Sequence, residues 1–118
     1  MSGLKVNAIY NTSGTEVYTA KAWVNFNGTG TVAIRASGNV SSITDNGTGD
    51  YTVNFTNAMP DANYCIAGVS NQNTSIGPVP VGVQSATAPT SSAARIECGF
   101  FSTNTRYDGA YVFVSIFR

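Results

Sequence analysis

The chain has 118 residues, of which 42% are hydrophobic and 10% are charged. A chain of this length supports one domain with one core, and its hydrophobic fraction excludes an intrinsically disordered segment. Six basic and six acidic residues give a formal net charge of zero, so the basic surface needed for nucleic-acid binding is missing. No apolar run reaches the roughly 18 residues that a membrane-spanning helix needs, so membrane insertion is not expected.

In chain order, short runs typical of β-strands alternate with turns rich in Asn, Ser, Thr and Gly. Strands are expected at residues 4–10, 16–27, 31–36, 40–45, 50–56, 63–69, 79–85, 94–100 and 110–117. The dipeptides Asn27-Gly28, Asn46-Gly47 and Asp108-Gly109 favour hairpin turns between them. No segment has a helical period, so the sequence predicts an all-β fold, an antiparallel β-sandwich that occupies residues 1–118 as a single domain.

The second expected strand places Trp23, the single tryptophan, on the same face as Lys21 and Asn25. Three interpretations remain open for this ring on an otherwise polar face. It could contact another subunit or sheet, belong to the core of the single chain, or form a stacking platform for a ligand. We favour the contact with another subunit or sheet.

The last expected strand is apolar on both faces, because the set Tyr111, Phe113 and Phe117 alternates with the set Val112, Val114 and Ile116. Such a strand either lies in the centre of the sandwich or is covered by a neighbouring subunit. With so few charges in a small domain, a neighbouring subunit is favoured. The expected subunit-interface residues are Trp23, Val112, Val114 and Ile116.

Several kinds of chemistry are missing from the sequence. Without histidine the chain cannot build a Ser-His-Asp or Cys-His arrangement, and it lacks the commonest metal ligand. The carboxylates are dispersed, and a glycosidase-like pair such as Asp45 and Asp50 is only weakly indicated by its spacing. We therefore expect no enzymatic activity, no cofactor and no metal. Cys65 and Cys98 lie in apolar runs and are expected as buried free thiols, with a disulfide as the alternative.

Three phrases of the sequence resemble a known family: "KAWVNFNGTGTVAIR" (21–35), "NVSSITDNGTGDYTVNFT" (39–56) and "MPDANY" (59–64). They resemble the C-terminal domain of tail-fibre and related virion proteins of bacteriophages, a resemblance that covers roughly residues 3–68. Residues 69–118 match only in general style. The resemblance implies a β-rich domain at the distal tip of a tail fibre, assembled as a homotrimer and engaged in host attachment. It also implies a virion location, assembly in the host cytoplasm, and a segment 1–20 that links to an upstream shaft.

Receptor contacts are expected where the resemblance fades, because loops on a rigid frame set specificity. Loop 70–78 carries amides suited to sugar hydroxyls, and loop 102–109 places an aromatic ring beside an arginine and a carboxylate. The alternative is an ordinary hairpin loop with a weak Arg–Asp pair. Expected partners are other copies of the chain and a bacterial surface glycan or outer-membrane protein. The candidate receptor-binding residues are Asn71, Gln72, Asn73, Asn104, Arg106, Tyr107 and Asp108.

Two other functions remain open at this stage. The domain could be a structural trimerisation or assembly module of the virion that has no ligand of its own. Less favoured is a fibre domain that cleaves polysaccharide, because that activity needs carboxylates gathered in a groove, and the single chain shows no such cluster.

Overall fold

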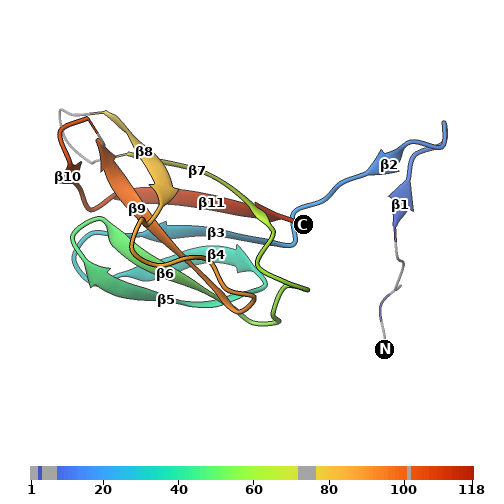
Figure 1. Ribbon diagram of the computed structural model, residues 1–118, viewed down its shortest axis with the longest axis horizontal. Helices are drawn as coiled ribbons and strands as arrows, with labels where there is room; N and C mark the ends of the chain where they lie inside the picture. Colours follow the sequence, from blue (N-terminus) through green and yellow to red (C-terminus); the bar gives the residue numbers. More distant parts are fainter. Residues whose placement is uncertain (1–2, 4–7, 72–76, 101) are drawn as a thin grey trace.

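The computed structural model describes residues 3, 8–71, 77–100 and 102–118, and this part of the chain consists of β-strands and turns, without a helix (Figure 1). The predicted all-β fold is thereby confirmed. The strands are β1 (Ile9–Tyr10), β2 (Glu16–Val17), β3 (Ala22–Asn27), β4 (Ala33–Gly38), β5 (Val40–Gly47), β6 (Asp50–Phe55), β7 (Cys65–Asn71), β8 (Pro78–Val83), β9 (Ala93–Phe100), β10 (Thr105–Arg106) and β11 (Tyr111–Phe117).

The main sheet has nine strands, which follow one path in the order β4-β3-β11-β7-β8-β9-β6-β5, with β10 paired to β9. All its pairings are antiparallel. The path curls over so that its two end strands, β4 and β5, come into contact. The result is a nearly closed barrel or sandwich, with the core enclosed between β4-β3-β11-β7 on one side and β8-β9-β6-β5 on the other.

The core follows from strict alternation along the strands. In β6, Tyr51, Val53 and Phe55 are buried while the residues between them face outward, as the sequence predicts for one buried and one polar face. The Tyr51 ring meets the Phe26 ring of β3 edge-to-face at a centroid distance of 5.1 Å and an interplanar angle of 77°. This geometry matches the preferred packing of aromatic pairs and joins the two sides of the sandwich.

One set of predicted interface residues lies elsewhere. Val112, Val114 and Ile116 are buried in the core of the single chain, packed with residues of the opposite side such as Ile96. Their side chains are therefore unavailable to a second subunit, and assigning them to a subunit interface was wrong. β11 is central, between β3 and β7, and its inward face completes the core.

The N-terminal segment departs from the predicted strand bounds. The expected strand 16–27 is two strands, β2 and β3, separated by residues 18–21. β1 and β2 form a small hairpin of their own, in the register Ile9↔Val17 and Tyr10↔Glu16. Figure 1 shows this hairpin away from the body of the domain, at the end where the C-terminus lies. The term N-terminal hairpin is used below for residues 8–18.

Two glycines of the predicted turns have another role. Gly28 and Gly109 are both buried, and the Gly28 amide donates a hydrogen bond of 2.7 Å to the Gly109 carbonyl. A Cβ atom on Gly28 would lie 2.3 Å from the Tyr51 hydroxyl oxygen, so the site requires glycine for close approach.

In the described ranges, no helix has the length and apolar character needed to span a membrane.

Candidate functional site

At the end of the domain opposite the N-terminal hairpin lie the β3–β4 turn, the β5–β6 turn, the end of β7 and residues 102–110 (Figure 1). Backbone hydrogen bonds tie them together: the Ala110 amide donates to the Asn71 carbonyl at 3.0 Å, and the Tyr107 amide donates to the Cys98 carbonyl at 2.9 Å. The first of the two loops that the sequence identifies, 70–78, begins on β7, and the second, 102–109, ends just before β11. Because β7 pairs with β11, these two points lie at the same end of the molecule.

Asp108 holds this end together from the inside. Its Oδ1 atom accepts a hydrogen bond of 2.9 Å from the Gly49 amide and lies 2.9 Å from the Tyr51 hydroxyl oxygen. The same hydroxyl lies 2.9 Å from the Gly28 carbonyl oxygen. Burial, and then the hydrogen bond with Asp108, raise the pKa of Tyr51 above its usual range, so the phenol stays a neutral donor.

Two of the predicted receptor contacts also have partners within the chain. Asp108 uses its carboxylate within the chain, and it is only half-exposed. Tyr107 is also half-buried, and its ring meets the Phe100 ring edge-to-face at 5.8 Å. The Asp108 carboxylate therefore has hydrogen-bond partners within the chain, and the Tyr107 ring has an aromatic one. The expected weak pair between Arg106 and Asp108 does not form, because both residues have other partners.

The remaining candidates fall into two groups. Asn71, Asn104 and Arg106 are exposed at the loop end, and Asn104 has a positive φ of 51°, a conformation that asparagine tolerates better than most residues. Gln72 and Asn73 lie outside the described residues. The described part of the candidate surface therefore consists of two amides and one guanidinium, a set that donates and accepts hydrogen bonds with sugar hydroxyls or polar peptide groups.

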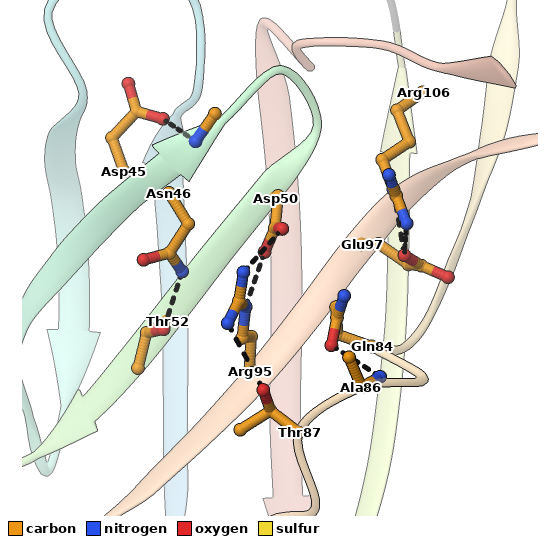
Figure 2. A network of polar contacts seen from close by, with 11 residues as sticks. Asp45, Asn46, Asp50, Thr52, Gln84, Ala86, Thr87, Arg95, Glu97 and Arg106 are labelled. Atoms are coloured by element: carbon orange, nitrogen blue, oxygen red, sulfur yellow. Dashed lines mark hydrogen bonds and ion pairs between the residues drawn. The ribbon is translucent and has the colours of Figure 1, made fainter.

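Arg106 belongs to a polar network on the outer face of β6 and β9, which the sequence analysis missed (Figure 2). Its guanidinium donates to Glu97 from Nε at 2.9 Å and lies 2.8 Å from the same oxygen through Nη2. Beside it, Arg95 forms a bidentate pair with Asp50: its Nε donates to Oδ1 at 2.9 Å and its Nη2 donates to Oδ2 at 2.8 Å. Asp50 and Glu97 are direct cross-strand neighbours, and each of these two buried carboxylates has its own arginine partner, which offsets the repulsion between them.

A signal for this network was present in the sequence. Within "AARIECGF", Arg95 and Glu97 alternate with Ala94, Ile96 and Cys98, which places both charges on one face of β9. What the sequence does not show is that β6 pairs with β9 in the register that sets Asp50 opposite Glu97. The two strands are separated by 37 residues of intervening chain, and such long-range pairing leaves no local pattern.

The Asp50–Arg95 pair gives the fold a pH dependence. Hydrogen bonds from Arg95 lower the pKa of Asp50 below its usual value, against the opposing effect of burial. A carboxyl group with a lower pKa in the folded state contributes stability above its unfolded pKa of about 4. This contribution is lost as the pH falls through the folded pKa. Replacing Arg95 with methionine should therefore lower the free energy of unfolding at neutral pH. The difference between the two chains should be smaller at about pH 3.

Urea unfolding of both chains at the two pH values checks this expectation. The matched control repeats the Arg95→Met comparison in an Asp50→Asn background, where the titrating carboxyl is absent and the pH dependence of the difference should largely disappear. An equal loss of stability at both pH values in the native background would contradict the assignment.

The carboxylates of this network, Asp45, Asp50 and Glu97, have partners within the chain. Asp50 and Glu97 are occupied by guanidinium groups, and Asp45 accepts a hydrogen bond of 3.1 Å from the Gly47 amide in its turn. No cluster of three or more His, Cys, Asp or Glu side chains suited to a metal ion occurs among the described residues. The polar network is therefore an arrangement of mutually satisfied ion pairs.

The two cysteines are free thiols, and they differ in environment. Cys98 is buried, as expected, and burial raises the pKa of its thiol to about 11. Cys65 is exposed at the start of β7, opposite Phe117 of β11, so the expectation that both thiols are buried was wrong for this residue.

A second candidate surface lies on the outer face of β3, β11 and β7. Trp23 and Phe113 are 44% and 42% exposed there. The Trp23 ring lies against Gly38 of the neighbouring strand, where a Cβ atom would come within 2.4 Å of its indole nitrogen. A shallow groove of about 520 Å³ runs between the two aromatic rings and Val69. The name apolar face is used below for Trp23, Ala67, Val69, Pro80, Tyr111, Phe113 and Phe117.

Trp23 is consequently not a residue of the core. The apolar face contains no charged side chain of its own, and Arg35 borders it, with its guanidinium carbon 4.3 Å from the centre of the Tyr111 ring. That arginine also donates a hydrogen bond of 2.7 Å to the Ala110 carbonyl, which anchors it. An exposed face with this many aromatic side chains is typical of a surface that contacts another molecule.

Comparison of the chain with protein-family models, with curated proteins and with solved structures finds no match.

Proposed function

We propose that the chain is a tail-fibre tip domain of a bacteriophage that assembles as a homotrimer and binds the host cell surface without catalysis. The resemblance of residues 21–35, 39–56 and 59–64 to such domains supports this proposal. The all-β frame supports it as well, since the nine-stranded main sheet is a rigid scaffold from which loops project.

The observation that carries the proposal is that the end of β7, where the first candidate loop begins, and residues 102–109 lie together at the end opposite the N-terminal hairpin (Figure 1). A fibre tip receives its shaft at one end and meets the receptor with the other. Asp108 and Tyr51 hold the loop end in one arrangement, while Asn71, Asn104 and Arg106 remain exposed there. Polar groups that are already held in their binding geometry lose less conformational entropy when a ligand binds, so residues that support the site and residues that contact the ligand are both needed.

The proposal is tested by binding to an array of bacterial lipopolysaccharides and to outer-membrane vesicles from a panel of strains. Arg106→Ala should weaken binding to a positive probe by about tenfold, because a lost hydrogen bond to a charged group costs about 1.5–3 kcal/mol. Arg118→Ala is the matched control. Both arginines have an ion pair of 2.8 Å and side chains 40% and 39% exposed, but Arg118 lies at the C-terminal end.

Arg118→Ala should bind like the native chain. Equal binding by all three chains would exclude the loop end as the contact surface. If no lipopolysaccharide or vesicle binds the native chain, attachment to these host components fails as its function.

A structural assembly module is the second candidate, and the apolar face favours it. In that case the chain associates with itself through this surface, and no loop substitution affects a ligand. Light scattering together with the binding array separates the two functions. A trimer that binds no probe favours the assembly module, and a trimer that binds favours the fibre tip.

A further inference from the structure

The N-terminal hairpin is built as a distinct unit. Asn11 organises its turn, since the Asn11 Oδ1 atom accepts hydrogen bonds of 3.0 Å from both the Ser13 and the Thr15 amides. Gly14 completes the turn with a φ of 84°. The two strands pair only with each other and contribute nothing to the main sheet. An isolated two-stranded hairpin is marginally stable in water, so this unit needs a surface against which to pack.

The hairpin also has apolar side chains that remain exposed in the part of the chain that the structure describes. Ile9, Tyr10, Val17 and Tyr18 are between 42% and 78% exposed. Their chain leaves the body at Lys21, whose amide donates a hydrogen bond of 2.7 Å to the Ile116 carbonyl. This bond fixes the exit point beside the end of β11, and the hairpin extends from there away from the body (Figure 1).

The apolar face offers a surface of matching character. Aromatic side chains present roughly 150–250 Å² each, so the exposed parts of Trp23, Tyr111, Phe113 and Phe117 amount to roughly 350 Å². A stable interface buries about 800 Å² on each partner. The four rings therefore supply close to half of that area, and the aliphatic residues of the face add to it.

We propose that the N-terminal hairpin of one copy packs on the apolar face of a neighbouring copy. The inference rests on the homotrimer in the proposed function and names the surfaces that would join its subunits. A contact from hairpin to face is heterologous, and three such contacts related by a three-fold axis close into a ring. Each copy then covers one apolar face and has its own covered.

Continuity between the two surfaces favours this occupant. A groove of about 480 Å³ lies at the base of the hairpin, and its lining joins apolar hairpin residues such as Ile9 and Val17 to Phe117, the last aromatic residue of the apolar face. The charged residues Glu16, Lys21 and Arg118 also line it. Apolar side chains of the hairpin thus already lie beside one member of the apolar face within a single copy. The hairpin has one charged side chain, Glu16, and the apolar face has one at its border, Arg35, so packing the two surfaces together desolvates few charges.

Thiol cross-linking between full-length chains tests the proposal. One chain carries Tyr18→Cys, a second carries Val69→Cys and a different mass tag, and both carry Cys65→Ser to remove the exposed native thiol. The chains are refolded together and treated with a short bismaleimide. A mixed covalent dimer is expected, at least about tenfold more abundant than with Thr44→Cys, because a docked site has a millimolar effective concentration. Thr44 lies exposed on β5, away from the apolar face.

Three results overturn the proposal, and each is distinct. Equal cross-linking at positions 69 and 44 shows that the hairpin has no preferred site on the neighbour. Cross-linking within a chain carrying both Tyr18→Cys and Val69→Cys, without the mixed dimer, shows that the hairpin folds back on its own face. A native chain that light scattering finds monomeric also removes the homotrimer from the proposed function. A trimer without the 18–69 link leaves that function standing.

Discussion

A chain in which alanine replaces Asp108 should have a free energy of unfolding about 2–4 kcal/mol lower than that of the native chain. The carboxylate accepts from the Gly49 amide and from the Tyr51 hydroxyl, and it also joins the β5–β6 turn to the segment before β11. Alanine removes both acceptor contacts and leaves the Gly49 amide without its partner. Chemical unfolding followed by circular dichroism measures the loss.

Asp108→Asn provides the matched control, because its side-chain oxygen can still accept from the Gly49 amide. It should retain at least half of the stability that Asp108→Ala loses. If asparagine and alanine destabilise the chain equally, the negative charge, and not the hydrogen-bond geometry, is what the site requires. A native-like stability for Asp108→Ala would contradict the role assigned to this residue.

The fold class could be predicted because its signal is local. In β6, the alternation of Tyr51, Val53 and Phe55 with polar residues fixes which face is buried, and the structure confirms it. The turns are equally local, since asparagine and glycine adopt backbone conformations that other residues avoid. The interruption of the predicted strand 16–27 at residues 18–21 was missed, because apolar and polar residues continue to alternate through this segment.

The sidedness of β11 could not be predicted in the same way. Tyr111 and Phe113 are as apolar as Val112 and Val114, so alternation alone does not say which set faces the core. The pairing with β3 decides: Val112, Val114 and Ile116 lie opposite the buried Phe26, Val24 and Ala22, which leaves the aromatic set of β11 on the outside. The interface prediction failed for this reason at Val112, Val114 and Ile116, whereas the exposed Trp23 remains available to a neighbour.

At the loop end the sequence predicts which segments contribute, but it does not predict what the individual side chains of these segments bind. It identifies both loops, and the pairing of β7 with β11 brings their ends together. It does not reveal that Asp108 serves Tyr51, a residue 57 positions earlier, or that Arg106 pairs with Glu97. A polar residue in a loop is equally compatible with a receptor contact and with an internal bond. Only the partner, which is distant in sequence, distinguishes the two.

Replacing Phe113 with lysine should convert the proposed homotrimer to monomers and leave the fold intact. Phe113 lies in the middle of the apolar face, in a cross-strand row with Asn25 and Val69. Its side chain is 42% exposed in the single chain, so an ammonium group at this position can reach water in the monomer. In an assembly that covers the face, the same charge is desolvated without a partner, at a cost of several kcal/mol at each of three sites.

Light scattering measures the mass of the particles, and circular dichroism verifies that the chain remains folded. Thr44→Lys is the matched control, since it adds the same charge to the polar outer side of β5 and should leave the mass unchanged. Emission from Trp23, the single tryptophan, gives an independent reading: assembly should shift it to shorter wavelength in the native chain and in Thr44→Lys, but not in Phe113→Lys. A folded Phe113→Lys chain that keeps the native mass would show that the subunits meet through another surface, because a close-packed interface does not accommodate an unpaired ammonium group at its centre.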